Sequence, residues 1–204
     1  MNNAHEYLTG DISSIIKAEV NQGKILTWAG MYVDPKDPDP NDIRIDDIAH
    51  ALSLICRYNG HTDVHYSVAQ HCIVVVDRLK TMKAPFKAQL MGLLHDSEEA
   101  YLGDMVSPVK KKYPEFCADG DELRAFIYDQ YIKDWDSFPL YSDLVKKADM
   151  DAYHMERLSF WAPYDVAERT IFEKFGRSVI KPIPPKQIEL QFLDYFSRLT
   201  DDYI

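Results

Sequence analysis

Apolar residues recur every three or four positions over most of the chain from residue 43 onwards, which is the spacing of one face of an α-helix. In the segment 45–58, Ile45, Ile48, Ala49 and Leu52 share one stripe, and two acidic residues stand in the first turn, where they complement the helix dipole. This pattern predicts an all-α fold, a compact helical bundle. The further helices that it predicts cover residues 67–80, 84–100, 107–113, 119–134, 139–160, 163–176 and 185–200.

The first 42 residues do not follow this period. The stretch ISSIIKAEV allows a short helix, and GKILTWAGMYVDP alternates between apolar and polar positions like a small hairpin. The prolines of PKDPDPND exclude a helix or a central strand there. We therefore expect an irregular N-terminal appendage over 1–42 and one domain over 43–204, because a chain of 204 residues is long enough for a single core.

Local signals mark several helix boundaries. Ser107 and Pro108 are typical of an N-cap that is followed by proline at the first helical position. The acidic run 119–122 is typical of a helix start, and the prolines of 181–186 separate the last two predicted helices.

The net charge of −10 at pH 7 argues against polymeric nucleic acid as a partner, because affinity for nucleic acid depends on cationic contacts with phosphates. A small nucleotide is not excluded, since a metal and a few local cations can neutralise one phosphate group. The cysteines, Cys56, Cys72 and Cys117, have no CxxC spacing and are typical of reduced core thiols. No leader pattern and no stretch approaching roughly 20 apolar residues is visible, so we expect a cytoplasmic protein without a membrane partner.

The fragment LLHDSEEAYLGDMVSPVKK, residues 93–111, carries the strongest chemical signal. It places His95 and Asp96 side by side after an apolar helical run, with Glu99 one turn later and Asp104 in a Gly-Asp step. A carboxylate that enters a protein interior needs a charge partner, because burying it alone is costly. The fragment therefore points to a divalent metal.

Two further residues complete a candidate ligand set. His71 shares a helical face with Val68, Val74 and Val75, so its imidazole is expected to point towards the core. Asp149 lies in a similar apolar context in LVKKADMDAYHMERL. Asp151, two residues further on, is the rival to Asp149, but it would point about 200 degrees away on an ideal helix.

Two neutral imidazoles and two carboxylates form a mixed nitrogen and oxygen set with a net charge of about −2. Such a set suits a borderline or hard divalent ion with open coordination positions, as a hydrolase requires. The ligands alone leave Mn²⁺, Co²⁺, Fe²⁺, Zn²⁺ and Mg²⁺ as candidates for this one metal ion.

The order of His71, His95 with Asp96, and Asp149 resembles the signature of the HD-domain metal-dependent phosphohydrolases. The wider text of 43–158 is most similar to the branch of the bacterial 5′-deoxynucleotidases and related phage deoxynucleotide hydrolases. The matching segments are DIAHALSLICRYNGH, YSVAQHCIVV, the dyad fragment and VKKADMDAYHMERL. This resemblance implies the same helical fold, this metal set, and an assembly of two or more copies.

The resemblance also implies two catalytic acids. Glu99 follows His95 by four residues and Asp96 by three, so it would lie on the same face if the helix continued, placed for proton transfer. Asp104 is implied to contact the nucleotide or to assist in proton transfer, although a Gly-Asp step is also a common turn.

Further residues are candidates for substrate binding. In the family an arginine followed by an aromatic residue precedes the first metal histidine, which implies that Arg57 holds phosphate and that Tyr58, where the bacterial enzymes typically have tryptophan, shapes the sugar pocket. An arginine at a helix C-terminus also has a purely structural use. His61 could reach the phosphate from its loop, and Lys110 or Lys111 could do so from the segment SPVKKK. The tryptophans, including Trp161, are expected to be packing anchors.

The expected function is release of phosphate from deoxynucleoside monophosphates. The first alternative is hydrolysis of dNTPs to triphosphate, which the same motif allows. A non-catalytic nucleotide-binding or sensor module is the alternative of another class, although the intact acid Glu99 argues against it.

Overall fold

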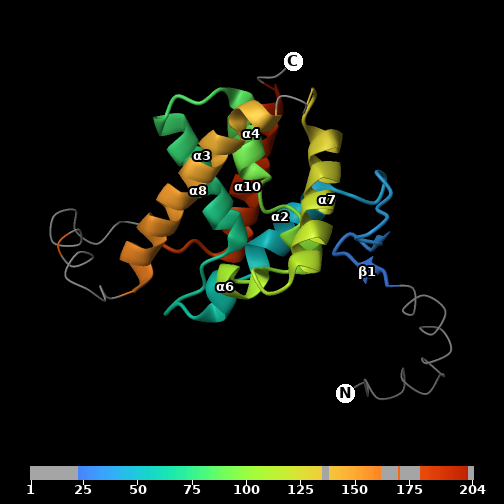
Figure 1. Cartoon of the computed structure of the whole chain (residues 1–204), viewed down its shortest axis with the longest axis horizontal. Coiled ribbons are helices and arrows are strands. Elements are labelled where there is room, and N and C mark those ends of the chain that lie inside the picture. The colour runs from blue at the N-terminus through green and yellow to red at the C-terminus, as the bar shows by residue number, and fades with distance from the viewer. Residues whose placement is uncertain (1–22, 135–137, 162–169, 171–179, 202–204) are drawn as a thin grey trace, which may run out of the picture.

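The computed structural model describes residues 23–134, 138–161, 170 and 180–201, which form a bundle of α-helices with one small sheet (Figure 1). The predicted all-α fold is confirmed. The segment ISSIIKAEV and, apart from Thr170, the predicted helix 163–176 lie outside the described residues. The elements are β1 (Ile25–Leu26), β2 (Tyr32–Val33), α2 (Ile45–Leu54), the 3₁₀ helix η3 (Arg57–Gly60), α3 (Val68–Thr81), α4 (Phe86–Leu93), α5 (Glu99–Leu102), α6 (Ser107–Lys110), α7 (Pro114–Tyr131), α8 (Phe138–Phe160) and α10 (Pro185–Asp201).

Helix α3 packs against four other helices of the bundle, α2, α4, α8 and α10. Its apolar face is fully buried at Val68, Val75, Val76 and Leu79. Burial of an aliphatic side chain of this size stabilises a fold by roughly 1.5–3 kcal/mol. In the part of the chain that the structure describes, no helix combines the length and the apolar character that a membrane crossing requires.

The predicted hairpin is present and is tied to the bundle. Strands β1 and β2 pair antiparallel, with Ile25 opposite Val33. The buried carboxylate of Asp47, in α2, accepts hydrogen bonds from Thr27 Oγ1 at 2.9 Å and from the Ala29 backbone N–H at 2.7 Å. Val33 is itself part of the core, so the hairpin is packed against the helices.

The predicted helix 84–100 is two helices with a turn between them. Helix α4 ends at Leu93, and the next helix, α5, begins only at Glu99. The imidazole of His95 turns back, and its Nδ1 lies 2.8 Å from the Gly92 carbonyl oxygen, which has no partner in a following helical turn. The HD dyad therefore lies in the break and not inside a helix.

The helix predicted over 45–58 is also shorter than expected. It ends at Leu54, and the chain then forms η3, in which Tyr58 and Asn59 have φ values of 59° and 51°. The loop is closed by the Arg57 backbone N–H, which donates to the Tyr66 carbonyl oxygen at 2.9 Å. Arg57 is thus placed by this loop and not by the end of a helix.

The region from 107 to 134 differs from expectation as well. Helix α6 covers only Ser107–Lys110, and its N-cap is Val106 and not Ser107. Helix α7 begins at Pro114, so the acidic run 119–122 is inside a helix and does not start one. Proline is well suited to the first turn of a helix. A Cβ atom at Gly120 would make ordinary contacts with the side chains of Glu98, at 3.6 Å, and of Leu102, at 3.8 Å.

Candidate metal centre

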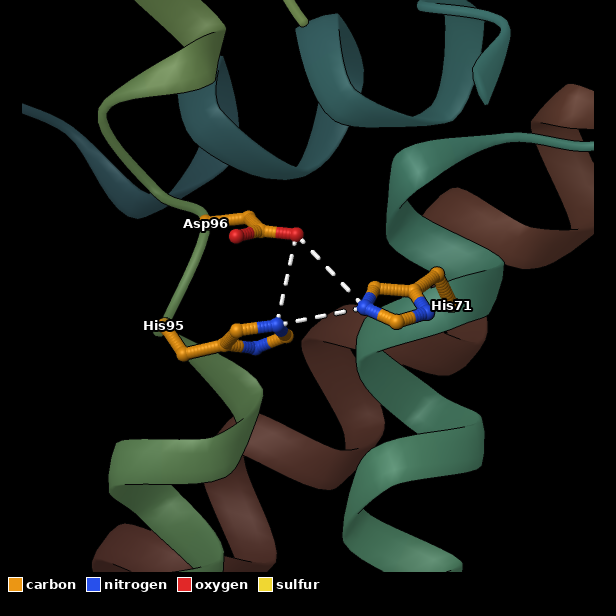
Figure 2. Close-up of side chains that lie close together, drawn as sticks. All are labelled: His71, His95 and Asp96. Atoms are coloured by element: carbon orange, nitrogen blue, oxygen red, sulfur yellow. Dashed lines mark hydrogen bonds and ion pairs between the residues drawn. The ribbon is translucent and has the colours of Figure 1, made fainter. Parts of the chain in front are cut away.

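The four predicted ligands converge from three elements. His71 comes from α3, His95 and Asp96 from the turn after α4, and Asp149 from α8. The Nε2 atom of His71 lies 3.2 Å from His95 Nε2, 3.6 Å from Asp96 Oδ2 and 3.1 Å from Asp149 Oδ1. His95 Nε2 lies 3.3 Å from Asp96 Oδ2 and 4.0 Å from Asp149 Oδ1. Figure 2 shows the first three side chains pointing towards one another.

Asp151, the rival to Asp149, lies elsewhere. Its carboxylate accepts a hydrogen bond from Arg78 Nη2 at 2.8 Å. The structure therefore brings Asp149, and not Asp151, to the histidines.

Both imidazoles present Nε2 to the shared point because their other nitrogens are engaged. His71 Nδ1 lies 2.6 Å from Glu156 Oε1, and His95 Nδ1 lies 2.8 Å from the Gly92 carbonyl oxygen. Since both partners accept hydrogen bonds, each Nδ1 is the donor, and this hydrogen bond fixes the orientation of the ring. Each Nε2 can then offer a lone pair.

This donor set fits a divalent cation. A cation with bonds of about 2.1–2.5 Å has neighbouring ligand atoms about 3 Å apart and opposite ones about 4–5 Å apart. Ligand atoms of His71, His95 and Asp96 all lie within 4.8 Å of one another, and Asp149 joins them through His71. Two Nε2 lone pairs and two carboxylates at one point repel one another unless positive charge lies between them.

The electrostatics of the cluster favour positive charge at this point. Burial and Arg57 oppose protonation of His71, but Glu156 and Asp149 raise the pKa of His71 to about 9. Burial lowers the pKa of His95. Burial also disfavours the Asp96 carboxylate, yet the two imidazoles and Arg57 hold the pKa of Asp96 below its usual range.

Glu156 is a member of the site that the sequence did not reveal. Its side chain is fully buried, in α8, two turns after Asp149. Burial alone would raise its pKa, but His71 and Arg57, together with a hydrogen bond from Tyr58, hold the pKa of Glu156 at about 2. The spacing of seven residues from Asp149 is the one signal in the sequence, and it is common to many helical glutamates.

A cavity of about 660 Å³ opens beside the ligands. Its wall contains Asp96 and Asp149 and every residue predicted to bind substrate or to transfer protons. The cavity-lining residues predicted for those roles are Arg57, Tyr58, His61, Glu99, Asp104 and Lys110.

Cationic groups of the cavity wall are paired with acids. Arg57 Nη1 lies 3.5 Å from Asp96 Oδ2, and its Nη2 lies 3.4 Å from Glu156 Oε2. Among the described residues, no partner lies within hydrogen-bond reach of the buried Arg57 Nε. Lys110 Nζ donates to Glu99 Oε1 at 2.6 Å. Both cations therefore stand at the border between the acids and the cavity.

The expected geometry of Glu99 is wrong, although Glu99 does line the cavity. The helix breaks after Leu93, so Glu99 reaches the site from α5 and not from the face that carries His95. Burial, together with Asp96 and Asp104, raises the pKa of Glu99 well above its usual range. Burial likewise raises the pKa of Asp104. Both acids are thus biased towards holding a proton.

A second acidic group adjoins the first. Ligand atoms of Asp96, Glu98 and Glu99 also lie within 4.8 Å of one another. Glu98 accepts a hydrogen bond from Arg124 Nη1 at 2.7 Å, and Glu99 accepts one from Lys110. Because these carboxylates already have cationic partners, the group around His71 is the better candidate for a metal.

The aromatic side of the cavity comes mainly from the end of α8. Tyr153 and Arg157 follow Asp149 at intervals of four residues, which keeps them on one helix face. Trp161 also lines the cavity, and its ring meets that of Tyr58 edge-on with centroids 4.8 Å apart. Trp161 was expected to be a packing anchor, but it contributes to the wall of the cavity.

Comparison with known proteins identifies two bacterial proteins that are similar in sequence to this chain. No protein-family model matches it. It is 32% identical over 184 residues to the uncharacterized protein YfdR of Escherichia coli strain K12, and the match covers 87% of the chain and 96% of that protein. An uncharacterized protein of Rhodobacter capsulatus is 43% identical over 108 residues, which cover 49% of the chain and 54% of that relative.

Proposed function

The chain belongs to the family of the uncharacterized Escherichia coli protein YfdR, and we propose, from its own site residues, that it is a metal-dependent phosphohydrolase of deoxynucleotides. The observation that carries this proposal is the convergence of His71, His95, Asp96 and Asp149 at one end of a cavity large enough for a nucleotide. Pockets for small ligands commonly measure about 300–1,000 Å³.

His71, His95, Asp96 and Asp149 would hold the divalent ion. When bound, such an ion supplies Lewis-acid polarisation of a phosphoryl oxygen and activation of water at neutral pH. Their mixed nitrogen and oxygen donors are compatible with Mn²⁺, Co²⁺, Fe²⁺, Zn²⁺ or Mg²⁺. The identity of the ion then depends on availability as well as on affinity.

Arg57 and Lys110 would bind the phosphate. The Arg57 guanidinium lies within 3.5 Å of Asp96, so an anion beside the ligands would meet it directly. A planar guanidinium can hold two phosphate oxygens at once, which orients the group as well as neutralising it. Lys110 and His61 add donors along the same wall.

Glu99 and Asp104 would move protons. Burial raises the pKa of Glu99 and of Asp104 and so favours their protonated forms, and a protonated carboxyl group can give its proton to a leaving alkoxide. The Glu99 side chain is only 3% exposed and lies next to Lys110, which keeps bulk water from this carboxyl group. We assign Glu99 the role of general acid and Asp104 that of its neighbouring partner.

The aromatic wall would receive the nucleoside. Tyr58, Tyr153 and Trp161 offer apolar ring surfaces to a sugar and a base, which release water when they stack. The Tyr58 hydroxyl is bound to Glu156, so Tyr58 presents its ring and not its hydroxyl to the cavity. This favours a sugar without a polar group on the face that meets the ring, as in a deoxyribonucleotide.

A panel of nucleotides tests the proposal. The metal-loaded protein should release phosphate from dNMPs faster than from ribonucleoside monophosphates, and removal of the metal by a chelator should abolish the release. Parallel assays on dNTPs, with detection of tripolyphosphate, test the alternative of triphosphate release. Hydrolysis of none of these nucleotides with any of the five metals would refute the proposal.

We also propose that the protein acts in the cytoplasm and as a homo-oligomer. The described cysteines, Cys56, Cys72 and Cys117, are all free thiols, as expected in a reducing compartment. Light scattering after size-exclusion chromatography measures the assembly directly, and a monomer at every concentration would refute the oligomer.

A further inference from the structure

We propose that Glu156 is a positioning residue that fixes the metal ligand His71 and the substrate-facing pair Arg57 and Tyr58 through one buried carboxylate. The inference rests on the proposed function, because it assigns Glu156 to the support of both the metal and the substrate. It adds a role that neither the HD dyad nor the cavity wall reveals.

Glu156 receives donors on both of its oxygens. Oε1 accepts hydrogen bonds from His71 Nδ1 at 2.6 Å and from the Tyr66 hydroxyl at 2.9 Å. Oε2 accepts a short hydrogen bond from the Tyr58 hydroxyl and lies 3.4 Å from Arg57 Nη2. The carboxylate is fully buried, so these protein groups replace all of its water. An ionised carboxylate has about four acceptor positions; three of them accept hydrogen bonds from His71, Tyr66 and Tyr58, and Arg57 is held beside the carboxylate as an ion pair.

The Oε1 side determines what His71 can do. With Glu156 accepting, the proton of His71 stays on Nδ1, and Nε2 faces His95 and Asp149. An imidazole whose outer nitrogen donates to a carboxylate is held in one orientation and is a more basic ligand. Glu156 thereby selects the nitrogen of His71 that meets the metal.

The Oε2 side holds a strained segment. Tyr58 and Asn59 both have left-handed backbone conformations, with φ values of 59° and 51°, which non-glycine residues adopt at a cost in free energy. Such conformations persist where the surroundings over-determine them. The hydrogen bond from the Tyr58 hydroxyl to Glu156 and the contact of the Tyr58 ring with Trp161 hold the segment in this conformation.

A neutral amide of the same shape cannot replace this carboxylate. The oxygen of glutamine accepts, but its NH₂ group donates, so one pair of donors would face another donor. A tyrosine hydroxyl could turn and accept from this NH₂ group, but the N–H group of His71 or of Arg57 would lose its acceptor. Glu156→Gln should therefore damage metal binding, substrate binding or both, without a change in side-chain volume.

The contact with His71 can be tested in metal-free protein by NMR. In the wild type we expect a downfield, exchange-protected Nδ1 proton of His71, which should disappear or move upfield in Glu156→Gln. Glu189→Gln is the matched control, because Glu189 is also a buried glutamate but contacts His50 and Lys186 in another part of the bundle. Absence of that proton in the wild type overturns the inference, whether or not any variant folds.

Titration calorimetry with Mn²⁺ and with dAMP tests the two consequences. Relative to the wild type and Glu189→Gln, Glu156→Gln should bind Mn²⁺ or dAMP at least about 10-fold more weakly. Tyr58→Phe removes only one donor to Oε2, so it should weaken dAMP binding while the His71 proton and the Mn²⁺ affinity stay as in the wild type.

These outcomes separate the inference from the proposed function. Wild-type affinities for both ligands in Glu156→Gln would overturn the role of Glu156, whatever the activity of the protein. Failure of every nucleotide assay, with the NMR signal and the loss of Mn²⁺ affinity in Glu156→Gln as expected, would instead overturn the proposed reaction and leave Glu156 as the residue that positions His71.

Discussion

His71 Nε2 and His95 Nε2 face each other at a distance of 3.2 Å, although they belong to different elements of the bundle. Each ring is turned to this position by a contact of its Nδ1, to Glu156 for His71 and to the Gly92 carbonyl oxygen for His95. Two nitrogens at this distance need a proton or a cation between them. The proton and the metal therefore compete for the same point.

This competition predicts that metal affinity rises with pH. Because the pKa of His71 is raised from 6.5 to about 9, metal-free protein carries a proton on this ring over most of the neutral range. Metal binding must displace that proton, so the affinity should increase about tenfold per pH unit up to about pH 9 and then level off. Calorimetry in buffers of different ionisation enthalpy would measure the affinity and the release of about one proton.

The raised pKa of His71 also affects the stability of the metal-free protein, which should fall as the pH rises. The contribution of protonated His71 is fully present below pH 6.5, its unfolded value, and is lost as the pH rises towards 9. Raising the pH from 6.5 towards 9 should therefore lower the free energy of unfolding of the apoprotein and raise its affinity for the metal. If protonated His71 stabilises the apoprotein, metal binding must displace that proton and the metal affinity must depend on pH. A metal affinity that is constant with pH would therefore contradict the raised pKa of His71.

Asp149 and Asp151 offer a matched pair for testing the ligand set. Asp149→Ala should lower metal affinity by more than roughly 10–100-fold, which is the loss typically caused by removing a residue that only hydrogen-bonds to a metal ligand. The side chain of Asp149 is 43% exposed, so its removal should leave the fold intact. Equilibrium dialysis followed by metal analysis would measure the loss.

The control is Asp151→Ala. Asp151 lies two residues after Asp149, and its replacement breaks a partly exposed ion pair with Arg78. It should retain wild-type metal affinity and lose about 1 kcal/mol of stability or less. Equal effects of the two substitutions on metal binding would remove Asp149 from the ligand set.

Most of the helices, and the residues that meet at the candidate metal centre, could be predicted from the sequence. Periodicity located α3 and α10 to within a residue or two, because one face of each is continuously apolar. The residues His71, His95, Asp96 and Asp149 were identified from their order and spacing, and the structure brings them together.

The breaks and the buried partners could not be predicted in this way. The apolar pattern of α4 continues past Leu93 without proline. The helix ends there because His95 contacts the Gly92 carbonyl oxygen and Asp96 contacts Arg57, which holds both residues in a turn. Glu156 looks like an ordinary helical glutamate until Tyr58, from a distant loop, is seen to donate to it. Such features depend on contacts between segments that are far apart in the sequence.

Gly92 allows α4 to lie close to α3, and this predicts a cost for any larger residue. A Cβ atom at this position would overlap Leu79 Cδ1 and lie 3.4 Å from Val75 Cγ1. Alanine improves helix propensity by about 1 kcal/mol, but overpacking of a buried contact costs about 1–3 kcal/mol. Because Leu79 is fully buried, its side chain would have to repack within the core, and Gly92→Ala should be destabilising in chemical denaturation.

A double-mutant cycle with Leu79→Ala isolates the cause. Leu79→Ala alone should cost about 2–5 kcal/mol, and Gly92→Ala should become neutral or stabilising in that background, because the overlap is gone. Additive costs would show that Gly92 serves another purpose. Gly92→Ala should also weaken metal binding, since it separates α3, which carries His71, from α4, which is followed by the turn that carries His95.

Glu99→Gln predicts a loss of chemistry without a loss of metal. The buried carboxyl group is assigned to proton transfer, and a positioned acid of this kind typically contributes about 10²–10⁴-fold to the rate. We therefore expect kcat on dNMPs to fall by that factor while metal affinity stays within about threefold of the wild type. Steady-state kinetics and metal titration on the same preparation would measure both.

Glu122→Gln, on the exposed face of α7, is the control for the loss of one negative charge, and its kcat should be unchanged. The pH profile gives an independent check, because a general acid must be protonated to act. Since burial and Asp96 raise the pKa of Glu99, the wild-type rate should fall on the alkaline side as this acid ionises. The alkaline limb should be absent from the residual activity of Glu99→Gln, and its persistence there would assign the limb, and the proton, to another residue.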